Sequence, residues 1–372
     1  MRNITAVICE INPIHPGHRY LLKLAGSGGD AVVCVMSGHF TQRGLPALFD
    51  KYARAESAVR CGADLVLELP YPWCASGAED FARGGCAVAA GIGAGCLTFG
   101  SETADLAMLE TGAAVRGSEE FVGRMRDAER TLRGGGSGTI FGQVMSSFGV
   151  TPGGGNDRLG MEYIRFGRLF GISSFRPVRR MEGVSSAGEL RGIYRAGGMD
   201  ALRPRLAEEA APALERAVVC PEEAWESVLF AHARLYLGAD SASCADNDLL
   251  RYAARCAGTS PDPASFLEKL PTKKYTASRM RRELLRSVVG TGESGEDPRF
   301  TVLLAANERG REVLAEHRRR GGLPVLVRPA DTSPLDETGM RQYALHRRAD
   351  EVYAYLTGLE AGAWMKRGPV MA

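Results

Sequence analysis

The sequence lacks the features that mark membrane, secreted and zinc-stapled proteins. No stretch approaches the roughly 18–20 uninterrupted apolar residues that a membrane-spanning helix needs. Nine cysteines at irregular spacing never form a C-x-x-C pair, so we expect buried, reduced thiols and neither a disulfide framework nor a structural metal site. The first residues show no signal or transit peptide, which favours a cytoplasmic protein. A formal net charge of +2 gives no overall field that would mark a nucleic-acid-binding protein.

Several common catalytic motifs are also missing. There is no H-E-x-x-H, no G-x-S-x-G, and no G-x-G-x-x-G after the first apolar stretch. Their absence argues against a metalloprotease, a serine hydrolase and a dehydrogenase. The chain has no internal repeat and no long low-complexity segment that would indicate a solenoid or a linker protein.

The 372 residues contain 45% hydrophobic and 24% charged residues, which is the composition of a globular protein with two domains. Short apolar runs alternate with helical patterns over the first hundred residues, and later the pattern becomes mostly helical. Such alternation predicts an α/β fold with a parallel sheet, in a domain over 1–205, followed by a mostly helical C-terminal domain over 206–372. The predicted strands are Ile4–Cys9, Ala31–Met36, Leu65–Leu69, Cys96–Phe99, Ser174–Val178 and, late in the chain, Pro324–Val327.

The most informative motif is Asn-Pro-Ile-His-Pro-Gly-His at 12–18, between the first predicted strand and the first predicted helix. The carboxyl end of a parallel strand is where α/β sheets bind nucleotides, and the following helix adds free N–H groups and a positive dipole end. Two imidazoles three residues apart, His15 and His18, can donate to the phosphate oxygens on which charge builds during attack. Gly17 lets a nucleotide approach the backbone. We therefore predict that His15 and His18 are catalytic.

The chain as a whole resembles a known enzyme family. The 12–18 motif is similar to that of the HIGH-motif nucleotidyltransferases, which share a Rossmann-like fold. The block at 33–70 is more specific, and it resembles the bacterial tRNA(Met) cytidine acetate ligases. The stretches that carry this resemblance are AVICEINPIHPGH at 6–18, VCVMSGHFTQRGLPALFDKYARAESAVRCGADLVLELP at 33–70, LTFGSE at 97–102, NDRLGMEYIR at 156–165, SAGELR at 186–191 and PTKKYTASRMRRELL at 271–285.

The resemblance implies an activity, its substrates and a set of ATP contacts. The enzyme would activate acetate with ATP and Mg²⁺ to acetyl-adenylate, and would then acetylate N4 of the wobble cytidine in elongator tRNA(Met). It implies no protein metal site and no membrane partner, and it leaves the oligomeric state open. The implied ATP-binding residues are Val7, Ile8, Cys9, Glu10, Asn12, Pro13, Gly17, His18, Gly100, Asn156, Arg179 and Arg180.

Each later ATP-binding candidate has a second interpretation. Gly100 ends a predicted strand and can lie beneath an adenine, but it can equally be a turn residue. Asn156 offers an amide to the base or ribose, but with Asp157 it can equally begin a helix as its N-cap. Arg179 and Arg180 can pair with a triphosphate, or they can form a solvated face.

The stretch Ser186–Arg191 looks like a degenerate form of the family's Ser-x-x-x-Ile-Arg phosphate motif. In that interpretation Ser186 and Arg191 are further ATP contacts. The alternative is an ordinary helix capped by Ser186 and Glu189. The preceding Met181–Ser185 departs from the family, because it is short and lacks the usual Tyr-His-Asp.

A basic cluster lies in the second predicted domain. Arg279, Arg282 and Arg286 fall at i, i+3 and i+7, which places them on one helical face, with Tyr275 nearby. Such a face suits an RNA backbone, and a tyrosine can stack on an unpaired base. The alternative is a solvated basic helix. The predicted tRNA-binding residues are Lys273, Lys274, Tyr275, Arg279, Arg282 and Arg286.

Three further residues draw attention without joining these motifs. Arg43 follows the second predicted strand and is a candidate contact for phosphate or tRNA. We expect His39 to be structural or exposed rather than catalytic, and Glu68 to lie at the edge of the crevice or at the exposed end of its strand.

Two other functions compete with the acetate ligase. One is a different adenylyl- or cytidylyltransferase of the HIGH superfamily, which would not need a basic helical second domain. The other is a catalytically impaired RNA-binding homologue, which the departure at Met181–Ser185 would explain.

Overall fold

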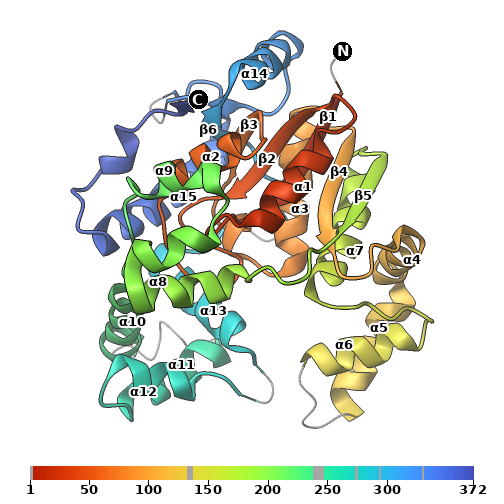
Figure 1. The fold of residues 1–372 in the computed structure, drawn as a ribbon. Coiled ribbons are helices and arrows are strands. Elements are labelled where there is room, and N and C mark those ends of the chain that lie inside the picture. Colours follow the sequence, from red (N-terminus) through yellow and green to blue (C-terminus); the bar gives the residue numbers. More distant parts are fainter. Residues whose placement is uncertain (1–2, 132–136, 238–246, 273–274, 293–294, 329–330) are drawn as a thin grey trace.

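A mostly parallel sheet with helices on both faces forms the centre of the molecule (Figure 1). The structure is a computed structural model that describes residues 3–131, 137–237, 247–272, 275–292, 295–328 and 331–372. The strand order is β5-β4-β1-β2-β3-β6-β7, with β8 also paired to β6. The first five strands are β1 (Ile4–Cys9), β2 (Ala31–Ser37), β3 (Leu65–Leu69), β4 (Cys96–Ser101) and β5 (Ser174–Arg179). They confirm the predicted α/β class and the five early strands.

The order of the strands places the site. From β1 the chain adds β2 and β3 on one side, and it then crosses to add β4 and β5 on the other side. All four pairings within this half are parallel, with Ile4 opposite Ala31 and Thr5 opposite Cys96. The point at which the order reverses therefore lies between β1 and β4, where open α/β sheets bind ligands at the carboxyl ends of their strands.

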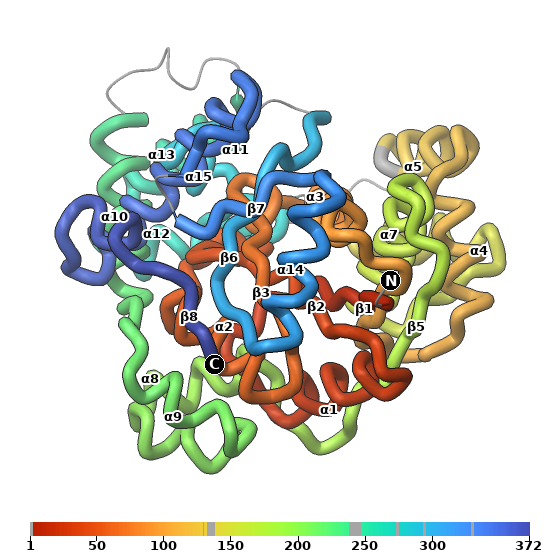
Figure 2. Tube along the Cα trace, turned by 90° about the horizontal axis from the view of Figure 1, so that it is seen from above, coloured from red at the N-terminus to blue at the C-terminus, as the bar shows by residue number. Residues whose placement is uncertain are grey.

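Helices cover both faces of the sheet, which is why β2 is buried along its whole length and reads as an unbroken apolar run. Figure 2 shows α1 and α2 on one face, and α3 and α7 on the other. Asp50 is the N-cap of α2, because its side chain accepts from the backbone N–H groups of Tyr52 and Ala53 at 3.0 and 3.1 Å. The bounds of these helices are α1 (Pro16–Ala25), α2 (Lys51–Arg60), α3 (Ala78–Gly91) and α7 (Gly155–Leu169).

Two helical groups extend below the carboxyl ends of the strands (Figure 1). The smaller group follows β4 and contains α4 (Leu106–Arg116), α5 (Glu119–Thr131) and α6 (Ser137–Ser146). The larger group follows β5 and contains α8 (Ala187–Leu202), α10 (Glu222–Ala231), the π-helix His232–Leu237, α11 (Asp248–Gly258), α12 (Pro263–Lys269) and α13 (Ala277–Val289). The short helix α9 (Ala211–Leu214) lies higher, where it packs against α2 (Figure 1). Short 3₁₀ turns occupy Trp73–Ala75, Arg203–Arg205, Glu208–Ala210 and Ala363–Met365.

The last quarter of the chain returns to the sheet. The sequence did not predict β6 (Thr301–Ala306), which is wholly buried and lies antiparallel to β3, with Leu65 opposite Ala306. The predicted strand near 324–327 is present as β7 (Val325–Leu326), and β8 (Val370–Met371) joins β6 near the C-terminus. Two helices complete this part, α14 (Glu308–Arg320) and α15 (Glu337–Leu356).

The C-terminal part is therefore mostly helical, but it also completes the N-terminal sheet. A boundary at 205 remains a prediction, and the strands β6, β7 and β8 belong to the same sheet as β1 to β5. Within the described residues, no helix has the length and apolar content needed to cross a lipid bilayer.

Candidate active site

The loop between β1 and α1 is held by a buried arginine. The guanidinium of Arg54, from α2, donates to the carbonyl oxygens of Glu10 at 2.7 Å, Ser37 at 3.1 Å and Phe49 at 2.9 Å, and also to that of Gly38. Arg54 is fully buried. Because its donors reach the ends of both β1 and β2, it fixes these two neighbouring loops relative to each other.

The predicted catalytic histidines lie together at the start of α1. Their ring centroids are 3.8 Å apart, with 33° between the ring planes. His15 is the N-cap residue, and its backbone N–H donates to Nδ1 of His18 at 3.3 Å. That bond leaves the proton of a neutral His18 on Nε2, where it can be donated to a ligand. A side chain at Gly17 would place its Cβ 3.0 Å from the ring of His15, so glycine allows the two rings to stack over the helix end.

Both imidazoles are neutral near pH 7. Burial, together with the charge of Arg180, lowers the pKa of His15 to about 4. Burial, His15 and Arg180 lower the pKa of His18 well below its usual value. Nδ1 of His15 is buried and has no hydrogen-bond partner among the described residues. The pair therefore offers neutral N–H donors, and one buried ring nitrogen is left for a ligand to satisfy.

Residues at the carboxyl end of β4 and the start of α7 form a dense hydrogen-bond network. One carboxylate oxygen of Glu102 accepts from the backbone and side-chain amides of Asn156 at 3.2 and 2.7 Å, and the other accepts from the backbone N–H of Asp157 at 2.8 Å. Asp157 in turn accepts from the hydroxyl of Ser101 at 2.5 Å and from the backbone N–H of Glu102 at 2.9 Å. These bonds outweigh burial and lower the pKa of Asp157. The N-cap of α7 is Gly154, so Asn156 is not the cap.

Arg179 is the last residue of β5, and Arg180 follows it. The two side chains contact different partners. The guanidinium of Arg180 lies 3.7 Å from the Glu102 carboxylate and close enough to both histidines to lower the pKa of each. Arg179 instead donates to the carbonyl of Thr103 at 2.9 Å. Gly100 lies beside this group, because a Cβ there would be 3.9 Å from Cγ of Arg180. Arg180 therefore faces the predicted site, whereas Arg179 supports the loop after β4.

The stretch Ser186–Arg191 lies at the start of α8. It has features of both interpretations, the capped helix and the phosphate motif. Ser186 and Glu189 form a reciprocal capping box, as the structural alternative predicts. Arg191, however, reaches the motif loop and donates to the carbonyl of Asn12 at 2.8 Å. Burial lowers the pKa of Arg191, while the carboxylate of Glu10 opposes this shift. The helix thus carries a half-buried cation to the loop that holds the histidines.

Glu10 connects this loop to the residues after β2. Its carboxylate accepts from the backbone N–H of Gln42 at 2.7 Å. Burial raises the pKa of Glu10, against the hydrogen bond from Gln42 and the charges of Arg191, Arg43 and Arg54. Arg43 is exposed and belongs to this charged group, and its contact with phosphate or tRNA stays a prediction. The side chain of Asn12 accepts from the backbone N–H of Leu48 at 2.9 Å, which links the motif to the same loop.

The basic helix α13 packs against that loop. Gly44, with φ +71°, has its Cα so close to α13 that an added Cβ would be 2.7 Å from the backbone nitrogen of Arg282. Arg282 donates to the carbonyl of Gln42 at 3.1 Å, and burial together with the charges of Arg286 and Arg279 lowers its pKa. Arg286 donates to the hydroxyl of Ser76 at 3.3 Å. The predicted basic face is therefore divided, since Arg282 and Arg286 also support the site loops.

Arg279 differs from its two neighbours. It is exposed, and its guanidinium lies 5.1 Å from the ring centre of Tyr275. Lys273 and Lys274 lie outside the described residues. Of the predicted tRNA contacts that the structure describes, Arg279 is the exposed one, whereas Tyr275, Arg282 and Arg286 are half-buried.

A buried ionic cluster was missed by sequence reasoning. The ammonium of Lys51 lies 2.9 Å from the Glu68 carboxylate and 2.8 Å from the Asp350 carboxylate. His39 shares a 2.8 Å hydrogen bond with Asp350, and His346 lies 3.6 Å from Glu68. Glu68 is fully buried, so the expectation that it lies at a crevice edge or an exposed strand end is wrong, because Lys51 compensates its charge inside the core. His39 is buried rather than exposed, and its structural role stays a prediction.

The same cluster contains ligand atoms close enough together to bind a metal ion, from Glu68, His346 and Asp350. The ammonium of Lys51 already lies between the two carboxylates, at 3.1 Å or less from each of their oxygens. A cation is thus already present at that position, and we assign the cluster a structural role.

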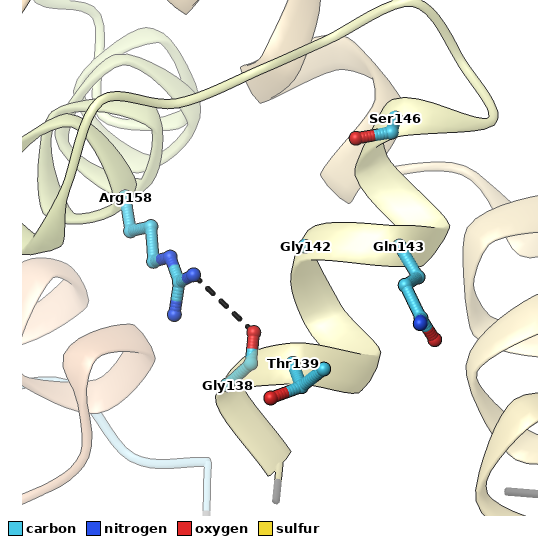
Figure 3. A pocket seen from close by; sticks show the side chains of 6 residues that line it. All are labelled: Gly138, Thr139, Gly142, Gln143, Ser146 and Arg158. Carbon is cyan, nitrogen blue, oxygen red and sulfur yellow. Dashed lines mark hydrogen bonds between the residues drawn. The ribbon is translucent and has the colours of Figure 1, made fainter. Parts of the chain in front are cut away.

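A large open hollow on the described surface lies elsewhere. It has a volume of about 740 Å³ and runs between α6 and the start of α7 (Figure 3). Arg158 crosses it to donate to the carbonyl of Gly138 at 3.3 Å. None of the predicted site residues lines this hollow, so size alone does not locate the site.

Comparisons with known proteins show which family the chain resembles. A family model described as "HIGH Nucleotidyl Transferase" matches residues 2–363. A tRNA(Met) cytidine acetate ligase of Syntrophotalea carbinolica is 31% identical over 86% of this chain and 84% of its own length. The protein of that name from Pediococcus pentosaceus is 28% identical over 98% of this chain and 97% of its own length.

Two solved structures share the whole fold. Thermotoga maritima TmcAL bound with alpha-thio ATP is 27% identical, covers 99% of both chains and superimposes with a TM-score of 0.88. The apo form of that protein is 26% identical, with the same coverage and a TM-score of 0.85.

Proposed function

The chain belongs to the HIGH nucleotidyltransferase family and, within it, to the tRNA(Met) cytidine acetate ligases, and from this premise we propose that it activates acetate with ATP and transfers the acetyl group to tRNA(Met). The observation that carries the proposal is the pair of neutral histidines beside Arg180, on a loop that Arg191 contacts at Asn12, at the point where the strand order reverses. A relative with 27% identity over the whole chain binds an ATP analogue.

The reaction has two steps. In the first, a carboxylate oxygen of acetate attacks the α-phosphorus of ATP, the bond to the bridging oxygen breaks, and pyrophosphate leaves. In the second, the N4 amine of the wobble cytidine attacks the carbonyl carbon of acetyl-adenylate. The C–N bond forms, the bond between the acyl carbon and the phosphate oxygen breaks, AMP leaves, and N4 loses one proton. The product is N4-acetylcytidine.

The histidines would stabilise the charge that develops in the first step. The Nε2–H of His18 and the ring N–H of His15 can donate hydrogen bonds to phosphate oxygens. Because both rings are neutral, neither histidine has to lose a proton before the reaction begins. The N-terminus of α1 adds backbone N–H groups, which favour an anion. The protein holds these donors in place before the reaction begins. Donors fixed in this way can lower the free-energy barrier of the reaction, rather than only bind ATP.

The positive charge around the loop would hold the phosphates. Arg180 lies on the β4–β5 side of the histidines, and Arg191 contacts the loop at Asn12. Gly100 and Asn156 border the β4 side, where an adenosine would lie. Mg²⁺ would arrive on the phosphates of ATP and help neutralise the leaving pyrophosphate. The nearby carboxylates of Glu10, Glu102 and Asp157 already accept hydrogen bonds from the protein, so we assign Mg²⁺ no protein ligand.

The shortened Met181–Ser185 stretch does not remove these groups. We propose that the chain is catalytically competent without the Tyr-His-Asp that the family usually carries there. In-line positioning of acetate needs only a small pocket with a few donors, and backbone N–H groups can supply them.

We propose that tRNA is bound by the second, mostly helical part of the chain, over 206–372. Arg279 with Tyr275 offers an exposed cation and an aromatic ring, and the helix that carries Arg279 touches the loop after β2. Arg282 and Arg286 add positive charge, although their side chains also bond to Gln42 and Ser76. A tRNA on this face would therefore lie beside the proposed adenylation site.

One experiment tests the proposal directly. The purified protein is incubated with ATP, Mg²⁺, labelled acetate and a tRNA(Met) transcript, and the digested RNA is analysed by mass spectrometry. We expect a cytidine heavier by one acetyl group, with label in the RNA. The rival functions make different predictions. ATP binding without acetyl-adenylate or acetylcytidine indicates an RNA-binding homologue, and acetate-independent nucleotidyl transfer indicates another transferase.

A further inference from the structure

A second cavity borders the motif loop and contains none of the proposed adenosine contacts. It has a volume of about 270 Å³ and lies between the loop after β2, helix α8 and the segment that leads into α10. Its lining residues are Leu45, Pro46, Leu48, Arg191, Tyr194, Arg195, Val219, Cys220, Pro221, Glu222 and Glu223. Its size is just below the roughly 300–1,000 Å³ of pockets for drug-sized ligands, so it suits a nucleobase better than a nucleoside triphosphate.

Two wall residues of the cavity are bonded to the motif loop. Arg191 donates to the carbonyl of Asn12 at 2.8 Å, and the backbone N–H of Leu48 donates to the side chain of the same residue at 2.9 Å. Asn12 lies three residues before His15. The cavity is therefore a direct neighbour of the proposed reaction centre. Gly100 and Arg180, in contrast, lie by the β4 end and do not line it.

The walls of the cavity combine apolar and aromatic surface with one ion pair. Leucine, proline and valine side chains line one part, and Tyr194 is half-buried among them, with its ring at 79° to that of Phe49. Arg195 and Glu222 are paired at 3.1 Å. The pair thus presents a hydrogen-bond acceptor next to a donor in the same cavity as the apolar side chains.

This pattern matches the pairing edge of cytosine. Its N4 amine donates, as carboxylates recognise in other nucleic-acid complexes, and its N3 and O2 accept. Uracil has an acceptor at position 4 and a donor at position 3, so it would place an oxygen against the carboxylate. Unpaired bases in RNA are commonly held by stacking on an aromatic ring and by hydrogen bonds to that edge.

We propose that this cavity receives the target cytosine of the tRNA, stacked on Tyr194, with its amino edge at the Arg195–Glu222 pair. The proposal rests on the proposed function, since it gives the position of the second substrate of that reaction. A base bound there would lie next to the loop that carries the histidines. It would approach this loop near Asn12, the residue to which Arg191 and Leu48 donate hydrogen bonds.

The test separates the two half-reactions. Acetate-dependent ATP–pyrophosphate exchange without RNA measures adenylation, and acetyl transfer to a tRNA(Met) transcript measures the second step. For Tyr194→Ala we expect transfer to fall about 5- to 150-fold, the equivalent of the roughly 1–3 kcal/mol of one stacked base, with exchange within twofold of wild type. Tyr194→Phe should retain transfer. Tyr355→Ala, at a 73% exposed tyrosine of α15, is the matched control.

The recognition of the edge is tested by binding. Wild type and Glu222→Gln are titrated with two tRNA(Met) transcripts that carry cytidine or uridine at the target position. We expect the wild type to prefer the cytidine transcript about 5- to 150-fold, and the variant to lose most of that preference. Thermal unfolding of each variant shows whether it is folded.

The outcomes distinguish the proposal from its premise. If Tyr194→Ala raises the KM for ATP in the exchange assay, the cavity belongs to the nucleotide and the proposal is overturned. It is also overturned if transfer is unchanged, or if the wild type binds both transcripts equally. If wild-type protein shows neither exchange nor transfer, the proposed function fails, and the binding preference still decides whether the cavity recognises cytosine.

Discussion

Replacement of Lys51 by methionine tests the buried ionic cluster most directly. Lys51 supplies the ammonium between the carboxylates of Glu68 and Asp350, and its side chain is 2% exposed. Burial disfavours its charge, but the two carboxylates outweigh this and raise the pKa of Lys51. Methionine keeps the length and apolar stem of the side chain and removes the charge, so two carboxylates are left buried without their shared cation.

The expected cost is about 3–5 kcal/mol, the usual penalty for leaving a buried charge without its partner. For a chain of 372 residues, an unfolding entropy of about 2.1 cal/mol/K per residue gives about 0.8 kcal/mol/K. The Tm should therefore fall by about 4–6 °C. Lys366→Met is the matched control, because Lys366 is 73% exposed and its partner Glu360 lies 3.6 Å away. That exposed pair should change stability by at most about 0.5 kcal/mol.

The stability lost in Lys51→Met should depend on pH, and the structure predicts the direction of that dependence. In the wild type, Lys51, His346 and His39 outweigh burial and hold the pKa of Asp350 well below its usual value. Asp350 therefore stabilises the fold above about pH 4, and this contribution is lost as the pH falls further. In Lys51→Met, the buried carboxylates have no cation beside them, so a carboxylate there has a raised pKa. The stability of the variant therefore falls as the pH rises and that carboxyl group loses its proton. The deficit of the variant should thus be largest near pH 7 and smaller at pH 5. Urea unfolding at both values measures it. A deficit equal to that of Lys366→Met, or one that does not change with pH, would refute the reasoning.

Three further predictions concern function. His15→Ala and His18→Ala should each lower acetate-dependent ATP–pyrophosphate exchange about 10²–10³-fold, the usual loss for one transition-state donor, and near-normal exchange in both would exclude their catalytic role. Because the pKa of His15 is lowered to about 4, the exchange rate at saturating substrate should show no inflection near pH 6.5; an inflection there that His15→Gln abolishes would contradict this. Arg279→Glu should weaken tRNA binding and make its log–log salt dependence shallower by about one, while Arg318→Glu, at the exposed end of α14, should change neither; equal effects would make Arg279 a solvated residue only.

Much of the nucleotide-binding half could be predicted because its signals are local. The short apolar runs and the strand–loop–helix order around His15 each lie within about ten residues. The antiparallel strand β6 could not be found in this way. Its sequence, TVLLAA, is as compatible with a buried helix as with a strand, and its partner β3 lies more than 200 residues earlier.

The candidate site could be proposed in part for the same reason. Residues within the motif, such as Asn12 and Gly17, stand out from the sequence of the loop itself, and their roles stay predictions. Arg54 and Lys51 were missed because a charged side chain on a helix normally indicates a solvated face, and their burial depends on distant partners. A carboxylate within a strand of leucines, Glu68, was the one available signal that a buried cation had to exist.

The place of β6 in the sheet also affects how the protein is made. β3 remains an open strand edge until Thr301–Ala306 has left the ribosome, and Asp350, which meets Lys51, is synthesised later still. At roughly 5–20 residues per second, the stretch from Leu69 to Thr301 takes on the order of 10–50 s. During that time the nascent half carries the proposed ATP-binding loop on a sheet with an unpaired edge at β3, the kind of surface that chaperones and proteases recognise. We therefore expect a prematurely terminated chain to be removed, rather than to persist as a fragment that binds ATP without tRNA.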